Sequence, residues 1–209
     1  MLGLPAATEI QKQLPKTTLA QKFNLGPEER RLLDRYVSRL ELVHQISPQT
    51  IPALSAGAEV KGIYILKVAL KVHNYDERVA RLILRLIPQK VVLYLVFEEE
   101  AQLAVLHEKL LVSPWRTEAT WNDASPLKLE GADLDAVWLG FKLQVGGISF
   151  EDGSEVTEET LSNALKAAEV CKRLDKEIAC LEKAMSAERQ PRRKFDLHRQ
   201  IQKLRKQLH

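Results

Sequence analysis

The sequence predicts an α+β fold, in which a small mixed or antiparallel sheet with flanking helices is followed by a C-terminal antiparallel helical hairpin. Two observations lead to this prediction. Up to residue 150, short apolar runs rich in β-branched residues alternate with segments whose apolar residues recur every three to four positions. After residue 150, apolar residues repeat with coiled-coil spacing on both sides of Pro191. We therefore expect an α+β body at 1–150 and a helical hairpin at 151–209.

The composition is that of a folded, soluble chain. Of 209 residues, 45% are hydrophobic and 28% are charged, and the formal net charge is only +3. The longest apolar runs, such as Val91–Phe97, are far shorter than the roughly 20 residues of a membrane-spanning helix. The N-terminus also lacks the pattern of an export signal. We therefore expect a cytoplasmic protein that has no contact with a membrane.

The segment before Pro48 predicts two helices. Thr8 is a suitable N-cap for a short helix that Pro15 would end. Pro27, followed by two glutamates, is suited to the first turn of a second helix. Apolar residues then recur at helical spacing up to Val43, so this helix is expected to end shortly before Pro48.

The next part of the chain predicts a central strand. Residues 47–57 contain two prolines and small polar side chains, which favour an extended connector. From Val60 to Val72 both faces are mostly apolar until Lys67 and Lys71 appear. This pattern is typical of a central strand with one end that is more exposed to solvent.

A helix and a β-hairpin are expected to follow this strand. Asn74 or Asp76 is the expected N-cap of an amphipathic helix that Pro88 ends. Residues 91–111 contain two β-rich runs separated by an acidic tip at 98–100, which is the pattern of an antiparallel hairpin. The second run predicts a strand less strongly, because its alanines and leucines also favour helix.

An irregular segment with two tryptophans precedes the last helix of the body. It carries Trp115, Arg116 and Trp121, a group suited to stacking bases or anchoring a protein partner. Tryptophans in such a segment more often close the edge of a small core, and this alternative stays open. Asp133 is the expected N-cap of the last body helix.

The C-terminal part predicts two helices that fold back on each other. After an acidic, glycine-containing linker at 150–154, Thr157 is the expected N-cap of a long helix. A short polar segment at 186–190 joins it to a second helix whose apolar seam has the same spacing. The seam residues are Leu174, Ile178, Leu181 and Met185 in the first helix and Leu197, Ile201, Leu204 and Leu208 in the second.

The second helix of the hairpin carries the strongest charge feature of the chain. Between 188 and 206, eight lysines and arginines stand against only Glu188 and Asp196. The simpler interpretation is a solvated coiled-coil flank that acidic residues of the first helix neutralise. The alternative is a surface that contacts phosphates or a protein partner. Its candidate contact residues are Arg189, Arg192, Arg193, Lys194, Arg199 and Lys203, of which the first three lie beyond the acidic partners.

The sequence contains no complete catalytic, metal or nucleotide site. The usual phosphate-binding loops, nucleophile elbows and zinc-ligand spacings do not occur, so we expect no metal and no cofactor and favour a protein that is not an enzyme. A nuclease of the restriction-enzyme type would need an acid at Ala69, and we therefore interpret Lys71 as structural. Cys171 and Cys180 are too far apart on one helix to bond, which predicts reduced thiols that pack in the hairpin.

Several short motifs occur in a characteristic order along the chain. They are Leu4-Pro5 with Thr8-Glu9, Leu14-Pro15-Lys16, Leu33 through Leu40, Ile46-Ser47-Pro48 with Thr50-Ile51, the strand Val60 to Lys71, Ile87-Pro88, the hairpin Leu93 to Leu106, Trp115 with Trp121, Leu127 to Trp138, and the basic hairpin. In this order the chain resembles a bacterial family, the domain of unknown function numbered forty-three ninety-one. The resemblance implies an α+β fold with a helical tail and supplies no catalytic residues. It also implies an accessory protein encoded beside DNA methyltransferases and helicases in restriction-like, phage-defence gene groups.

The leading hypothesis from these features is a non-enzymatic adaptor. Its body would dock on a larger DNA-processing protein, such as a helicase or a methyltransferase, and its hairpin would extend that contact or touch a nucleic-acid backbone. Two alternatives stay open. One is a degenerate metal-dependent nuclease built around the strand that ends at Lys71, and the other is a structural homodimer in which two hairpins form a four-helix bundle.

Overall fold

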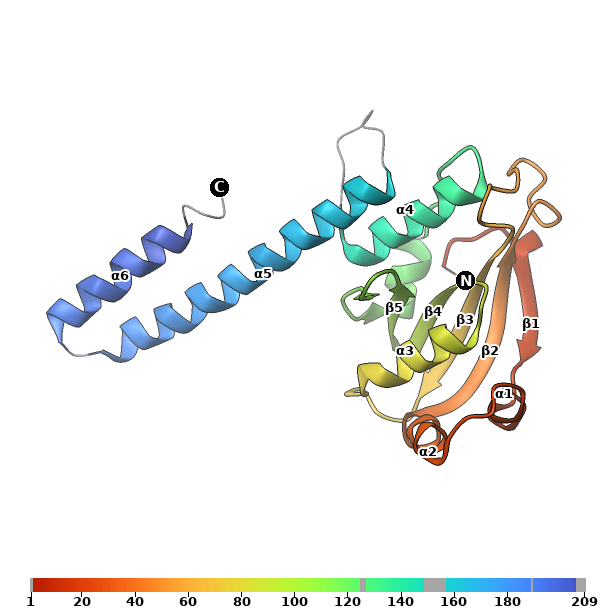
Figure 1. The fold of residues 1–209 in the computed structure, drawn as a ribbon, viewed down its shortest axis with the longest axis horizontal. Helices are drawn as coiled ribbons and strands as arrows, with labels where there is room; N and C mark the ends of the chain where they lie inside the picture. The colour runs from red at the N-terminus through yellow and green to blue at the C-terminus, as the bar shows by residue number, and fades with distance from the viewer. Residues whose placement is uncertain (1, 125–126, 149–156, 189, 206–209) are drawn as a thin grey trace. The chain divides into compact units, whose positions relative to one another are not determined.

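The chain forms two compact units, residues 1–154 and 155–209. The computed structural model describes residues 2–124, 127–148, 157–188 and 190–205 (Figure 1). The predicted boundary at 150 and the predicted linker at 150–154 lie outside these described residues. Within the described ranges, no helix is long and apolar enough to cross a membrane.

A mixed sheet of seven strands forms the centre of the first unit. The strands are β1 (Glu9–Gln13), β2 (Val37–Ile46), β3 (Ile63–Leu70), β4 (Lys90–Phe97), β5 (Glu100–Leu106), β6 (Leu110–Val112) and β7 (Arg116–Thr117). Their order is β1-β2-β3-β4-β5-β6, and β7 pairs with the start of β5. Among these strands only β3 and β4 run parallel. The predicted α+β fold with a mixed sheet is therefore confirmed.

Helices cover both faces of this sheet (Figure 1). The first face packs against α1 (Lys16–Lys22), α2 (Pro27–Tyr36) and α3 (Glu77–Leu86), and the second against α4 (Leu134–Gly146). α3 also makes the crossover between β3 and β4, which parallel pairing requires. Because helices cover both faces, β3, β4 and β5 bury side chains on both sides, as the apolar runs predict.

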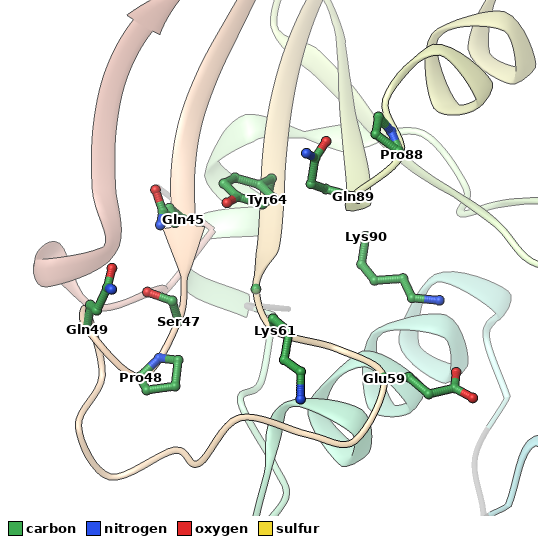
Figure 2. A pocket seen from close by; sticks show the side chains of 11 residues that line it. Gln45, Ser47, Pro48, Gln49, Glu59, Lys61, Tyr64, Pro88, Gln89 and Lys90 are labelled. Atoms are coloured by element: carbon green, nitrogen blue, oxygen red, sulfur yellow. The ribbon is translucent and has the colours of Figure 1, made fainter.

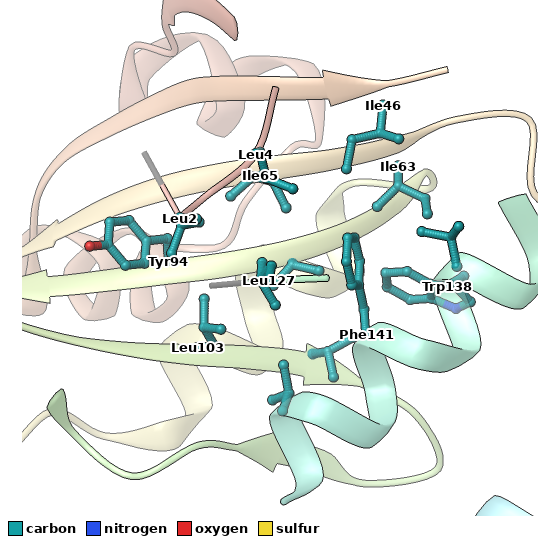
Figure 3. Close-up of a cluster of buried hydrophobic side chains, with 14 of the residues drawn as sticks. Leu2, Leu4, Ile46, Ile63, Ile65, Tyr94, Leu103, Leu127, Trp138 and Phe141 are labelled. Carbon is teal, nitrogen blue, oxygen red and sulfur yellow. The ribbon is translucent and has the colours of Figure 1, made fainter. Parts of the chain in front are cut away.

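Each face of the sheet has its own apolar core. On the second face, Phe141 of α4 packs over Ile63 and Leu103 of the sheet (Figure 3). Leu2 and Leu4 enter the same core, so the N-terminal segment lies on the sheet. On the first face, apolar side chains of α1, α2 and α3 pack on the alternate residues of the same strands.

The helix predicted after Thr8 is wrong. The chain forms one 3-10 turn, Ala6–Thr8, and then enters β1, which pairs with β2. Thr8 is buried, and its hydroxyl donates to the carbonyl of Pro5 instead of capping a helix. The cause is tertiary: the buried N-terminal leucines hold the segment against the sheet, where the free edge of β2 satisfies its backbone.

The helix predicted from Pro27 is correct only as far as Tyr36. The next ten residues, Val37–Ile46, form β2. The register between β2 and β3 shifts at two points, between Val37 and Arg39 and between Leu42 and His44. Each shift adds a residue to β2 and turns the following side chains to the other face. Apolar residues three positions apart, such as Val37 and Leu40, therefore lie in the same core. In the sequence, this spacing looks like that of an amphipathic helix.

The predicted extended connector at 47–57 instead begins with hydrogen-bonded turns, in which the N–H of Ile51 donates to the carbonyl of Ser47 at 2.9 Å. Three other predicted elements of the body are confirmed. α3 begins at Asp76, whose Oδ1 accepts the N–H of Arg78 at 2.9 Å, and it ends before Pro88. β4 and β5 form the antiparallel hairpin with its acidic tip. α4 begins at Asp133, whose Oδ1 accepts the N–H of Ala136 at 2.9 Å.

The second unit consists of two helices that pack together, α5 (Glu158–Ala187) and α6 (Pro191–Arg205). Thr157 caps α5 as predicted, with its Oγ1 accepting the N–H of Thr160 at 3.2 Å. The predicted seam supplies buried apolar residues to both helices, including Leu174, Ile178 and Ile201. Cys171 and Cys180 are free thiols but exposed, so the prediction that they pack in the hairpin is wrong.

Candidate nucleic-acid and partner interface

Four residues of α6 form a continuous exposed surface, which we call the outward stripe. Arg192, Phe195, Arg199 and Lys203 follow one another at steps of three or four, so they share one face of the helix. The buried seam, represented by Ile201, is displaced from this face by about 200° around the helix axis. All four stripe residues are exposed. The stripe therefore faces away from α5.

The basic residues beside the stripe are paired with acidic residues. Nη1 of Arg193 lies 3.8 Å from Oε2 of Glu188, and Nη2 of Arg205 lies 2.7 Å from Oε1 of Glu182. Arg193, which lies beyond the acidic residues of the first helix, is thus paired with Glu188 in the segment that joins the two helices. Arg189, the first candidate residue, lies outside the described residues.

The three cations of the stripe differ from these flanking residues. None of Arg192, Arg199 and Lys203 forms an ion pair with a side chain that the structure describes. Phe195 lies among them and exposes 67% of its surface. Lys194, the remaining candidate contact residue, is also exposed. The stripe thus combines three cations that have no described ion pair with a large exposed aromatic ring, and the exposed Asp196 lies beside it, four residues after Arg192.

The candidate group Trp115, Arg116 and Trp121 lies against the body. The indole N–H of Trp121 donates to the carbonyl of Ala101 at 2.9 Å, and its side chain is only 4% exposed. The guanidinium of Arg116 covers the Trp121 ring at 5.0 Å. Trp115 stacks on His73 with ring centres 4.5 Å apart. These contacts close the edges of the two cores, and a partner-anchoring role stays a prediction.

A buried polar chain supports the segment that carries Trp115. The hydroxyl of Tyr75 donates to Oε1 of Gln102 at 2.8 Å, and Nε2 of Gln102 donates to the carbonyl of Ser113 at 2.7 Å. Oγ of Ser113 in turn accepts the N–H of Leu103 at 2.9 Å. Burial raises the pKa of Tyr75 far above its ordinary value, so this hydroxyl stays a donor. The network fixes the chain between β6 and β7.

The neighbourhood of Lys71 contains no described carboxylate cluster. Nζ of Lys71 donates to the backbone carbonyl of Asp34 at 2.6 Å. In β3, which ends one residue before Lys71, Nζ of Lys67 pairs with Oε1 of Glu118 at 3.1 Å. Among the described residues, no group of three or more His, Cys, Asp or Glu side chains could hold a metal ion. Nothing in the described geometry therefore favours the nuclease alternative.

A groove that sequence reasoning missed lies where strands and loops meet around Tyr64. It consists of two adjoining hollows of about 430 and 420 Å³ that share Tyr64, Pro88 and Gln89. Figure 2 shows the first hollow, which Lys61 and Lys90 also line. The second extends to α1. We call the two hollows together the Tyr64 groove. Its residues come from separate segments of the chain, so no local motif marks them.

Comparison with known proteins identifies the family. The family profile described as "Domain of unknown function (DUF4391)" matches residues 2–208. The chain belongs to the DUF4391 family. The match spans both compact units of the DUF4391 protein, including the hairpin that carries the stripe. No curated protein and no solved structure matches the chain.

Proposed function

We propose that this DUF4391 protein is a non-enzymatic accessory protein that binds the phosphate backbone of a nucleic acid with the outward stripe of α6. The observation that carries the proposal is the exposure of Arg192, Arg199 and Lys203 on one face without described acidic partners. A surface that only flanks a coiled coil would be expected to pair these cations as it pairs Arg205. Unpaired cations in a row are what a polyanion requires.

The dimensions of the stripe suit a phosphate backbone. Arg192 and Lys203 are eleven residues apart, so the stripe is about 16 Å long at 1.5 Å per residue. Arginine also binds phosphate through two parallel hydrogen bonds, which fixes the register of the protein on the backbone. Phe195 lies between the cations, where an unpaired base could stack on its ring.

The setting we propose for this binding is an assembly that processes DNA. The resemblance in the order of motifs implies restriction-like, phage-defence gene groups, and a helicase or methyltransferase would be the larger partner. In such an assembly the sheet unit would dock on the enzyme and the hairpin would hold the nucleic acid near it.

The test is fluorescence-anisotropy binding of labelled duplex DNA at two salt concentrations. Reversing the charge of the stripe with Arg192→Glu, Arg199→Glu and Lys203→Glu should abolish a salt-sensitive binding signal. Each lost phosphate contact lowers the slope of the logarithm of the binding constant against the logarithm of the salt concentration by about 0.9. The control reverses three exposed cations of α5, Lys166, Arg173 and Lys176, so that the net charge changes equally. This control should retain most of the binding.

Two outcomes would contradict the proposal. If the intact protein fails to bind duplex DNA at low salt, the stripe has no backbone-binding role, and a protein partner becomes the better explanation of the exposed Phe195. If both triple variants lose binding equally, the effect belongs to net charge and not to the stripe.

A further inference from the structure

We infer that the Tyr64 groove in the sheet unit is a second binding site, and that its ligand is a single-stranded nucleic acid. The groove lies in a different compact unit from the stripe, so this inference does not depend on the proposed function. It is argued from the charge of the rim, the side chains of the floor and the size of the hollows.

The rim of the groove is positively charged. Lys61 and Lys90 line the first hollow, and Lys12 and Lys22 line the second, whereas Glu59 is the single acidic side chain among the lining residues. None of these four lysines forms an ion pair with a described acidic side chain; Nζ of Lys61 donates to a backbone carbonyl, that of Gly57, at 2.6 Å. Each hollow therefore offers two lysines without a described ion pair to an anionic ligand, and Glu59 offsets part of this charge in the first hollow.

The floor of the groove is apolar and aromatic. Tyr64 lies in β3, is half-buried and lines both hollows, and Phe23 and Leu42 line the second. Aromatic rings between cations are the arrangement with which proteins bind single strands, because each base stacks on a ring while its phosphate meets a lysine. An acidic peptide would use the lysines but would leave the aromatic floor without a matching planar group.

The remaining polar residues and the dimensions point to the same ligand. Gln45, Gln49 and Gln89 line the groove, and each amide can both donate to and accept from the edge of a base. Hollows of about 430 and 420 Å³ lie in the range of small-molecule pockets and suit one unstacked base each. A duplex stacks its bases inside and exposes only their edges, so it cannot fill such hollows.

The experiment measures binding of a fluorescein-labelled single-stranded dodecanucleotide to the full chain, with the stripe already reversed by Arg192→Glu, Arg199→Glu and Lys203→Glu. In this background Tyr64→Leu should weaken binding about 5- to 100-fold, because it removes the stacking ring but keeps an apolar side chain. Tyr64→Phe keeps the ring and should bind as the parent does. An abasic strand of the same length should bind as weakly as Tyr64→Leu.

The lysines are tested in the same background. Lys61→Ala with Lys90→Ala should lower the salt slope by about 1.4, the amount expected for two phosphate contacts on a single strand. Lys109→Ala with Lys128→Ala removes two lysines that do not line the groove and should leave the slope unchanged. Equal binding of the abasic and the normal strand, or equal binding by Tyr64→Leu and Tyr64→Phe, would overturn the inference. Because the stripe is already reversed, failure here is distinct from failure of the proposed function.

Discussion

Glu98 lies at the tip of the β4–β5 hairpin in a left-handed backbone conformation, with φ of 53°. A residue with a Cβ is strained in this region, whereas glycine adopts it freely. Glu98→Gly should therefore raise the free energy of unfolding by up to about 1 kcal/mol, measured by urea denaturation. Glu99→Gly is the control, because Glu99 has no positive φ and the same substitution should there be neutral or destabilising. A loss of stability at residue 98 would contradict this account.

Asp135 in α4 holds the connector that precedes β3. Its carboxylate accepts the backbone N–H groups of Ala58, Glu59 and Val60 at 2.6, 3.3 and 2.8 Å. The bond from Val60 is the largest cause of a pKa below the ordinary value of the carboxyl group. A Cβ at Gly57 would collide with this carboxylate, so a larger residue there would displace the Asp135 side chain. The connector is thus ordered by one side chain 75 residues away from Val60.

Asp135→Asn should lower the free energy of unfolding by about 1–2 kcal/mol, because the amide replaces one acceptor oxygen by a donor that faces N–H groups. The folded pKa lies below the unfolded value, so the carboxylate contribution is fully present above about pH 4 and is lost as the pH falls. The difference between wild type and Asp135→Asn should therefore shrink below pH 4 in urea titrations. Asp123→Asn, at an exposed position, should change stability little at any pH.

His44 is a buried histidine whose pKa is lowered in the folded chain. Nδ1 of His44 lies 3.0 Å from Oγ1 of Thr8, and the tautomer of the ring decides which of the two atoms donates. Nε2 of His44 is buried and has no described hydrogen-bond partner. Burial is the largest cause that lowers the pKa of His44. Protonation would place a charge in the core.

Stability should therefore fall as the pH drops below about 6.5, because the unfolded chain then binds a proton that folded His44 does not. His44→Gln removes this titration, so the decline in the free energy of unfolding between pH 7.5 and 5.5 should become shallower. His198→Gln serves as the comparison, since His198 is exposed on α6 and should leave the decline as it is. An unchanged pH profile in His44→Gln would rule out a neutral buried histidine.

At the scale of elements, α6 uses its two faces for different purposes. Ile201 is 3% exposed in the seam, whereas Phe195 is 67% exposed on the stripe. Ile201→Ala should destabilise the hairpin by about 2–4 kcal/mol, detected as faster proteolysis of α6 and lower helical ellipticity. Phe195→Ala removes a larger side chain, but it should destabilise the hairpin by less than about 0.5 kcal/mol and so leave proteolysis and ellipticity nearly unchanged. Equal losses would show that Phe195 is packed.

β2 shows why the sequence predicts a helix where the chain forms a strand after Tyr36. Helical spacing of apolar residues after Pro27 is real, and α2 uses it as far as Tyr36. Beyond that point the same spacing comes from two register shifts against β3, which no short window of sequence reveals. By contrast, α3 and α4 were predictable because Asp76 and Asp133 each cap an unbroken amphipathic segment.

At the scale of the whole molecule, the chain divides into two compact units, and each contains buried apolar residues. A protein truncated after Gly153 should therefore keep a cooperative unfolding transition, measured by denaturation of tryptophan fluorescence. If the chain is an adaptor, light scattering should give the same number of chains per particle for the intact and truncated proteins. If it is a homodimer held by hairpins, the truncated protein should become monomeric while the intact one is dimeric.

The amino-acid sequence by itself determined the features that depend on residues close together in the chain. Caps, apolar periods and the charge surplus after residue 188 were sufficient to predict α3, the β4–β5 hairpin, α4, α5 and α6, and to select the basic candidates. Only the tertiary structure decided what depends on partners distant in the chain. Pairing of β1 with β2 overrode a local helix signal, and ion pairs distinguish Arg193, which pairs with Glu188, and Arg205, which pairs with Glu182 of α5, from the stripe cations. The Tyr64 groove exists only because strand pairing brings separate segments together, which sequence spacing cannot encode.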